Sequence, residues 1–490
     1  MIESLVKLHD KFSVEFKLGY NARKKRRISD FSVNTWFFIP GSLDINPATY
    51  SKTDFYRDLK VNVRLSTPVF LLRDIAGDRN SPFPMLQEAF EQLASHPSRT
   101  SAEGFEYQIK MFLSILKSAL RDEIAHLGRN EFSDDREFLA DAFVNNASLI
   151  ASKYRDLRRI INAPTIQPNQ FNYFLFGDEF MSNLIEHHAF LLIAKLESLG
   201  FTAGQAFRNR ILGLIQQEVD YKQKMGFKVV SKESYAENRE LTFRLGLLKK
   251  YAESELFVKT SKKRDGILVE QIYLSLAAGI SMVFATAVAF SFQTRFGNLT
   301  MPFFVALVIS YMLKDRIKEL GRYYFAHKLG KWNFDHKTVV GLGSRAIGYV
   351  REAMDYIPES KVPEEVVKLR DRSPILEANN RVSGEKIILY RKHVRLNRKL
   401  LDESSLYHVN GLVEILRMNF SNLTLKMDNP EVPLFALDDS EQGYSMVKAE
   451  KLYFLNLILQ LRYEDQSELQ RYRIGFNRNG LQSIEQTFQP

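Results

Sequence analysis

The segment from Ile272 to Phe292 contains no charged residue. It is about as long as the 20 residues that an α-helix needs to cross the hydrocarbon core of a bilayer. A second uncharged segment, Leu299 to Leu313, follows a short polar break, and Pro302 lies near its start, where a missing amide costs a helix little. The second segment is shorter than a comfortable span, but local thinning of the bilayer could accommodate it. We therefore predict a two-helix transmembrane hairpin within residues 266–330, followed by an interfacial helix.

Basic residues flank this pair of apolar segments, whereas the turn between them carries only Arg295. The flanking residues are Lys259, Lys262, Lys263 and Arg264 before the first segment, and Lys314, Arg316, Lys318 and Arg322 after the second. Positively charged flanks stay on the cytoplasmic side. We expect a protein integral to a membrane, the inner membrane if bacterial, with both termini cytoplasmic. A buried helical hairpin in a soluble protein is the alternative.

The rest of the chain alternates between strand and helix patterns, so the predicted fold class is membrane-anchored α+β. Phe12, Val14, Phe16 and Leu18 alternate with polar residues, as in a half-buried strand. The predicted domains are a β-rich N-terminal segment (1–82), a cytoplasmic helical bundle (83–265), the transmembrane hairpin (266–330) and a cytoplasmic C-terminal α+β region (331–490). Because both tails contain strands, we hypothesise that they pack together as one assembly.

Two shorter segments of the C-terminal region also receive predictions. Residues 345–356 follow a glycine-rich connector and are expected to form a helix. Residues 428–442, rich in acids and proline, are expected to form an exposed loop.

The composition excludes several kinds of chemistry. There is no cysteine, so disulfides, cysteine-ligated zinc, iron–sulfur sites and thiol nucleophiles are excluded. The charged fraction of 26% is that of an ordinary globular protein, which fits a large water-soluble mass around a small apolar part. The net charge of +10 indicates an anionic neighbour, either acidic lipid or nucleic acid.

The strongest local run of positive charge is Arg23, Lys24, Lys25, Arg26 and Arg27, between two predicted strands. Each basic residue near an anionic leaflet contributes about 1 kcal/mol of attraction. Given the nearby apolar segments, we favour anionic lipid headgroups over nucleic acid as the partner, and a plain solvated hairpin tip is an equal alternative. A second basic stretch, Arg391 to Arg395, is expected to form the polar face of a strand or helix.

Small residues recur every four positions along the first apolar segment, at Ala277, Ser281, Ala285 and Ala289. This spacing lets two helices approach closely in lipid. The partner could be the second apolar segment, which we favour, or another subunit, which leaves a homo-oligomer open.

Metal ligation is the one chemical possibility with candidate residues. Glu123 and His126 form one E-x-x-H pair, and Glu186 and His187 lie on a later predicted helix. Di-iron bundles use two such pairs with two further glutamates, and this chain supplies one pair. We therefore expect solvated or hydrogen-bonded side chains instead of a metal site, and no cofactor.

No catalytic motif points to an activity. The chain lacks H-E-x-x-H, the P-loop pattern and G-x-S-x-G, so no catalytic residue is assigned. We favour a non-catalytic scaffold or regulatory protein that is attached to a lipid bilayer and binds unidentified protein partners, because the apolar segments carry no ionisable residue of a proton or ion pathway. The alternatives are a membrane-tethered enzyme, with its site in the bundle or the C-terminal region, and an oligomeric membrane-disrupting effector.

Overall fold

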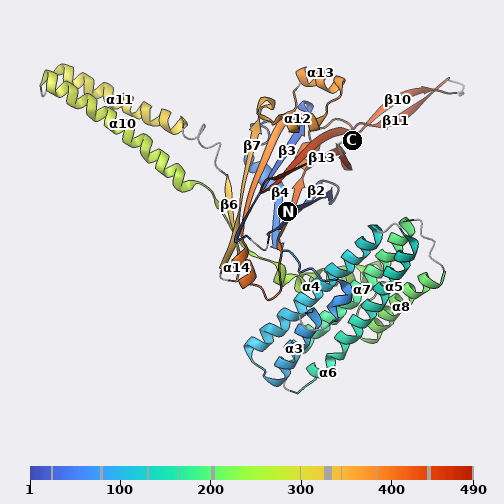
Figure 1. The fold of residues 1–490 in the computed structure, drawn as a ribbon. Coiled ribbons are helices and arrows are strands. Elements are labelled where there is room, and N and C mark those ends of the chain that lie inside the picture. Colours follow the sequence, from blue (N-terminus) through green and yellow to red (C-terminus); the bar gives the residue numbers. More distant parts are fainter. Residues whose placement is uncertain are drawn as a thin grey trace. The chain divides into compact units, whose positions relative to one another are not determined.

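The computed structural model describes residues 1–23, 26–77, 81–129, 132–164, 166–199, 205–297, 300–324, 334–343, 345–382, 384–438 and 443–487. The chain divides into two compact units. The first, the sheet unit, comprises Met1–Val63, Lys259–Leu406 and Gly411–Pro490, and the second, the helical unit, comprises Arg64–Val258 and Tyr407–Asn410 (Figure 1).

The sheet unit is built on an eight-stranded antiparallel sheet in the order β14-β13-β12-β3-β8-β7-β6-β5. Its strands are β3 (Ile28–Ile39), β5 (Lys259–Arg264), β6 (His336–Leu342), β7 (Arg345–Ile357), β8 (Lys386–Asn397), β12 (Tyr453–Tyr463), β13 (Gln466–Asn477) and β14 (Gly480–Thr487). A second sheet has the order β1-β2-β9-β4, with β1 (Ile2–Leu8), β2 (Ser13–Asn21), β9 (Gly411–Asn419) and β4 (Leu59–Leu65). A separate two-stranded ribbon consists of β10 (Glu431–Leu437) and β11 (Tyr444–Glu450).

Strands from the two ends of the chain share both large sheets. β3 lies between β8 and β12, so that Phe37 is opposite Ile388 on one side and Leu457 on the other. β2 pairs with β9 in the same way, with Phe16 opposite Leu416. This pairing confirms the expectation that the N- and C-terminal tails form one assembly.

The two faces of β3 are both buried, and this explains its run of aromatic residues. Trp36 and Phe38 pack against Val366 of helix α12 on one face. On the other face the Phe37 ring lies 6.1 Å from Phe55 of helix α1. The short helices of this unit are α1 (Lys52–Asp58), α12 (Glu364–Arg370), α13 (Pro374–Val382), α14 (Arg398–Glu403) and α15 (Ser421–Thr424), with 3₁₀ turns at Gly41–Leu43 and Glu359–Lys361.

Two predictions for the C-terminal region are wrong. Residues 345–357 form strand β7 between β6 and β8, not a helix. Part of the expected loop 428–442 is strand β10. In β7 the buried side chains include Ile347, Val350 and Met354, a spacing that resembles a helix when it is read along one strand alone.

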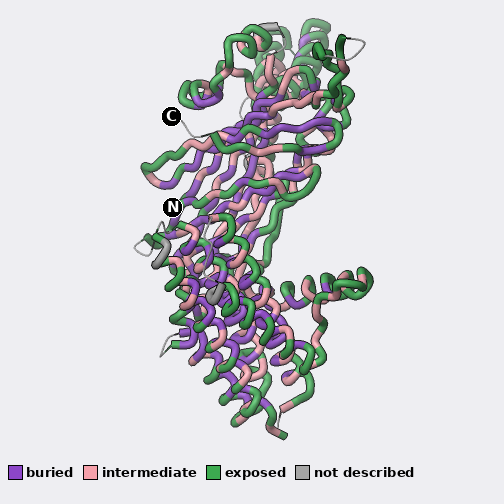
Figure 2. Tube along the Cα trace, turned by 90° about the vertical axis from the view of Figure 1, so that its right-hand side faces the viewer, coloured by how far each residue is buried: buried purple, intermediate pink, exposed green. Residues whose placement is uncertain are grey.

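The helical unit contains α2 (Leu72–Ile75), α3 (Pro82–Ser95), α4 (Arg99–Arg129), α5 (Ser133–Asp156), α6 (Arg158–Ile161), α7 (Pro168–Ser198), α8 (Gln205–Lys224) and α9 (Tyr235–Ala252), followed by a 3₁₀ turn at Ser254–Leu256. Its core is aromatic, with the Tyr154 ring stacked between Phe112 and Phe174 at centroid distances of 5.8 and 5.2 Å. Buried residues follow the strands and the inward sides of the helices (Figure 2).

Helices α10 (Ile267–Phe296) and α11 (Met301–Tyr324) form an antiparallel hairpin between β5 and β6, which we call the arm. The predicted two-helix transmembrane hairpin is wrong. Among the described residues, one helix is long and apolar enough to cross a membrane, over Glu270–Phe296 of α10. In α11 the uncharged segment ends at Leu313, and the second half of the helix carries charged residues. The fold is therefore mixed α+β with large antiparallel sheets and one candidate membrane helix.

Gly177 of α7 offers a test of the packing in the helical unit. A Cβ atom at this position would lie 2.1 Å from the Tyr154 hydroxyl, whereas a Cβ at Gly213 of α8 would meet no atom within 4 Å. We expect Gly177→Ala to destabilise the chain by about 1–3 kcal/mol, because the core must shift. Gly213→Ala should stabilise it by about 0.5–1 kcal/mol, since alanine favours a helix. Urea denaturation followed by circular dichroism measures both, and a stabilising Gly177→Ala would contradict the packing.

Candidate functional site

The arm is the candidate functional site because many of its large apolar side chains are exposed. A helix that is apolar around its whole circumference is normally buried in a core or in a membrane. The exposed large apolar residues of α10 are Ile267, Ile272, Leu276, Ile280, Met282, Val283, Phe290, Phe292 and Phe296, and those of α11 include Met301, Phe304, Val305, Leu307, Val308, Ile309, Met312, Leu313 and Leu320.

Small residues bring α10 and α11 together. Ala277 and Ser281 are buried against α11, and a Cβ atom added to Gly321 would lie 2.9 Å from the Cβ of Ala277. The other two predicted packing residues, Ala285 and Ala289, are half-buried. The two helices therefore lie in close contact near Ala277 and Gly321.

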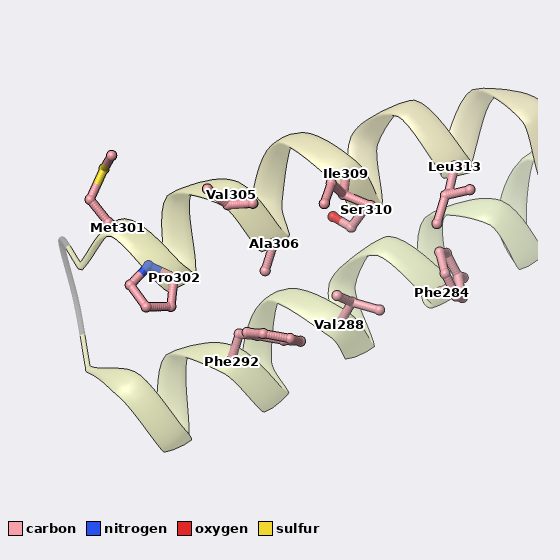
Figure 3. A pocket seen from close by; sticks show the side chains of 10 residues that line it. All are labelled: Phe284, Val288, Phe292, Met301, Pro302, Val305, Ala306, Ile309, Ser310 and Leu313. Carbon is pink, nitrogen blue, oxygen red and sulfur yellow. The ribbon is translucent and has the colours of Figure 1, made fainter.

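Toward the turn of the arm the two helices separate and leave an apolar groove of about 540 Å³ (Figure 3). Its lining side chains come from both helices: Phe284, Val288 and Phe292 from α10, and Met301, Pro302, Val305, Ala306, Ile309, Ser310 and Leu313 from α11. The groove therefore continues the apolar surface of the arm inward.

Several hydroxyl groups of the arm are hydrogen-bonded within their own helix. Five of them donate a hydrogen bond to a carbonyl of their own helix, at oxygen–oxygen distances of 2.8–3.1 Å: Ser281, Thr286, Ser291, Thr294 and Ser310. In hydrocarbon every polar group must be satisfied within the protein, because water is absent. These five side chains meet that requirement.

The alignment of the two helices determines where the uncharged segment of α10 lies beside the uncharged segment of α11. Phe284 lies at the level of Leu313, and Ala277 at the level of Gly321. The part of α10 between Ala277 and Phe284 therefore lies beside a charged part of α11, which contains Lys314, Asp315, Arg316, Lys318 and Glu319. Beyond this level lies the end of the arm that we call the apolar end, where the described part of α11 carries no charged residue and that of α10 carries only Arg295.

The predicted basic cluster lies beside an acidic residue. Arg23 and Arg26 each form an ion pair with Glu464, at 3.1 and 3.2 Å, and the Arg27 carbonyl accepts a hydrogen bond from the Arg398 amide. Lys24 and Lys25 lie outside the described residues. The pairing with Glu464 partly neutralises the predicted anion-binding site.

The weak metal candidates are not brought together. Glu186 pairs with buried Lys222, and the exposed His126 and His187 lie on α4 and α7. Burial raises the pKa of Glu123, and the nearby His126 opposes that shift. The described residues contain no group of three or more His, Asp or Glu side chains that could hold a metal ion.

A polar cluster that the sequence did not predict lies inside the helical unit. The Arg155 guanidinium bridges Asp178 (3.3 Å) and Glu218 (2.6 Å), and the Ser182 hydroxyl donates to Glu218 at 2.6 Å. Tyr221 donates to Asp178. Burial raises the pKa of Asp178, and Tyr221 and Arg155 partly offset that effect. The partners satisfy one another, so this cluster holds α5, α7 and α8 together.

A second buried cluster joins the two sheets. Lys392 of β8 and Glu414 of β9 are each 1% exposed and form an ion pair, and the Tyr20 hydroxyl donates to Glu414 at 2.9 Å. Glu352 accepts a hydrogen bond from Tyr390 at 2.7 Å. Burial alone would raise the pKa of Glu352, but the neighbouring lysines lower it. Lys392 therefore belongs to the interior and not to the expected polar face of the second basic stretch.

Comparison with known proteins identifies no relative: no family model matches, and no curated protein or solved structure is significantly similar.

The buried imidazole of His188 provides a pH test of the helical unit. Its Nδ1 lies 2.8 Å from the Leu184 carbonyl, and burial lowers its pKa to about 4 from 6.5. Because the unfolded chain binds the proton more tightly than the native chain, the native state loses stability as pH falls from 6.5 toward 4. Between pH 7 and pH 5 the loss should be about 2 kcal/mol.

Urea denaturation at these two pH values measures the effect. His188→Gln should lose less stability on acidification than the natural chain, whereas His187→Gln, on the exposed neighbour, should behave as the natural chain does. Identical acid sensitivity in all three proteins would contradict the assignment.

Proposed function

We propose that this chain is a membrane-attached scaffold that inserts the apolar end of its arm into a lipid bilayer and holds its two folded units at the surface. The observation that carries the proposal is the exposure of large apolar side chains on both helices of the apolar end. A protein partner covers one face of a helix pair, whereas acyl chains surround it completely. The groove between the helices is lined by apolar side chains, and acyl chains can fill it as well.

Both ends of the arm belong to neighbouring strands, so the arm enters and leaves the bilayer on the same side. Arg264 at the end of β5 pairs with His336 at the start of β6. The apolar end extends from Met301 to Leu313 on α11, which is about 20 Å at 1.5 Å per residue. This length exceeds half of the roughly 30 Å hydrocarbon core but is shorter than the whole. We therefore propose attachment from one side.

The charged half of α11 suits the headgroup region. Four basic and two acidic residues follow the apolar end: Lys314, Arg316, Lys318 and Arg322, with Asp315 and Glu319. Their excess of positive charge attracts anionic lipid. Because such flanks stay on the cytoplasmic side, we propose that the folded units face the cytoplasm.

A scaffold is favoured over an enzyme because the buried polar clusters are paired internally. Asp178 and Glu218 are engaged by Arg155, and Glu414 by Lys392. Such groups stabilise the interior, whereas a catalytic site presents polar groups in a cleft that a substrate can enter. The folded units then serve as binding surfaces for protein partners.

Vesicle flotation of the full chain tests membrane attachment. Phe304 in the apolar end and Leu320 in the charged half lie on the same helix and are similarly exposed, at 64% and 66%. A lysine at the apolar centre of an inserted helix costs about 3 kcal/mol, or roughly a hundredfold in partitioning. Phe304→Lys should therefore reduce flotation strongly, and Leu320→Lys should leave it nearly unchanged. A natural chain that stays in the aqueous fraction, or equal effects of the two variants, would contradict the proposal.

A further inference from the structure

Strand β5 is one of the two edges of the eight-stranded sheet, and all six of its residues are exposed. Its ladder with β6 shows which backbone groups point outward. The amide of Asp265, the next residue, donates at 3.1 Å to the carbonyl of Asp335, which lies opposite it when the β5–β6 register is continued by one residue. Hydrogen-bonded pairs alternate with non-hydrogen-bonded pairs along an antiparallel ladder. The amides and carbonyls of Thr260, Lys262 and Arg264 therefore point away from the sheet.

This edge is open and basic. Within the described residues, no other strand pairs with it and its outward backbone groups have no backbone partner. Such an edge is a template for pairing with another strand. Four of its six residues are basic: Lys259, Lys262, Lys263 and Arg264. Strand β14, the opposite edge of the same sheet, carries no basic residue, so the two edges differ in charge.

Two of the four basic side chains are not neutralised by the described part of the chain. Lys259 and Lys263 form no ion pair there. The other two basic side chains of β5 are each paired with a glutamate. The nearest acid in the sequence, Asp265, is paired with Arg351 at 3.1 Å. The two unpaired lysines are therefore available to an external anionic group.

Lys263 also lies in a row of like charges across three strands. It is directly opposite Lys337 of β6, and Lys337 is directly opposite Arg351 of β7. The Lys337 ammonium lies 4.7 Å from the centre of the Tyr349 ring and forms no ion pair with a described residue. Like charges directly opposite one another destabilise a sheet. A carboxylate beside Lys263 would relieve this repulsion.

We propose that the β5 edge pairs with an acidic β-strand of a partner protein. Only a peptide strand can continue the ladder and bring negative charge at the same time. Phosphate groups of lipid or nucleic acid would neutralise the lysines but leave the amides and carbonyls of the edge unpaired. Lysine on an edge repels basic strands, so the charges that favour an acidic strand also exclude others. As a partner of the proposed scaffold, this strand rests on that function for its role but not for its binding.

Antiparallel pairing specifies the sequence of the partner strand. Lys259 and Lys263 lie at positions that are non-hydrogen-bonded toward the partner, where the side chains of two strands are closest. They lie on one face of the sheet, with Ser261 between them. Two carboxylates four residues apart in the partner strand would therefore lie opposite the two lysines. The expected motif is two Glu or Asp residues separated by three residues of a β-strand.

Binding of acidic peptides to the full chain in an uncharged detergent, measured by fluorescence anisotropy, tests the pairing. The core sequence Glu-Val-Thr-Val-Glu places the backbone groups of both valines toward β5 and those of both glutamates away from it. N-methylation of the valines should weaken binding about tenfold or more, because two hydrogen bonds to the edge are lost. N-methylation of the glutamates leaves the same charge and should have little effect.

Charge reversal tests the ion pairs. The double variant Lys259→Glu with Lys263→Glu should bind the acidic peptide about tenfold more weakly and should bind Lys-Val-Thr-Val-Lys instead. The double variant Lys249→Glu with Lys250→Glu, at exposed positions of α9, makes the same change in net charge and should behave as the natural chain does. Thr260→Pro removes an outward amide without touching the ladder to β6, and it should also weaken binding.

No binding of the unmethylated peptide, equal weakening by the two N-methylated forms, or no binding of the charge-swapped pair would overturn the proposal. Binding of a single-stranded oligonucleotide or of anionic lipid micelles in place of the peptide would overturn it in favour of phosphate. A dimer of the natural chain that Thr260→Pro dissociates would overturn it in favour of a second copy. These measurements are made in detergent, so their outcome is separate from that of vesicle flotation.

Discussion

The pairing of β5 with β6 is the constraint on which the arrangement of the arm depends. The chain leaves the large sheet at Arg264 and returns to it at His336, directly opposite in the adjacent strand. Whatever surrounds the arm, its two ends begin at one sheet edge. If α10 crossed a bilayer and separated β5 from β6, the six residue pairs between these two strands would be lost. The sheet therefore holds the two ends of the arm at adjacent positions.

The alignment of α10 with α11 is the second constraint. The uncharged segment of α10 is longer than that of α11. Hydropathy along the sequence gives these two lengths but not how the two helices align. In the hairpin, part of the apolar segment of α10 lies beside charged residues of α11. Only the apolar end is then available for insertion into a bilayer. Arg295 near the turn is a cost of about 2.5–3.5 kcal/mol if it is fully inserted. The nine exposed Phe, Leu, Ile and Val side chains of the apolar end (Phe290, Phe292, Phe296, Phe304, Val305, Leu307, Val308, Ile309 and Leu313) offset it at about 0.3–0.6 kcal/mol each.

The sequence predicted local features well and long-range pairing poorly. Strand β12 was evident from its β-rich apolar pattern, and the helices of the helical unit from their three- and four-residue spacing. The position of β3 between two C-terminal strands could not be read from periodicity. Alternation shows that a strand has a buried face, but not which strands pair with its edges. Residues 345–357 were misassigned because β7 has buried side chains on both faces, including Ile347 and Val350, so its pattern lacks the alternation of a half-buried strand.

The site residues divide in the same way: those with a local signal were recognised in the sequence, and those that depend on a distant partner were not. Ala277 and Ser281 were found because small residues at helical spacing are a local signal. Lys392 was hidden within a basic stretch, and only its partner Glu414, from a strand distant in sequence, explains why its charge is buried. The ribbon of β10 and β11 was missed because its proline and acids resemble those of a loop, and the pairing of Pro433 with Lys448 is not evident from either segment alone.

The most direct test of the account is a spin-label accessibility scan along α11 of the full chain in liposomes. Single cysteines from Met301 to Tyr324 would be labelled one at a time in the cysteine-free background. The account predicts that labels at the exposed positions from Met301 to Leu313 are accessible to oxygen and shielded from a water-soluble nickel reagent, with a change at Lys314. Access of the nickel reagent along the whole helix would contradict attachment through the apolar end.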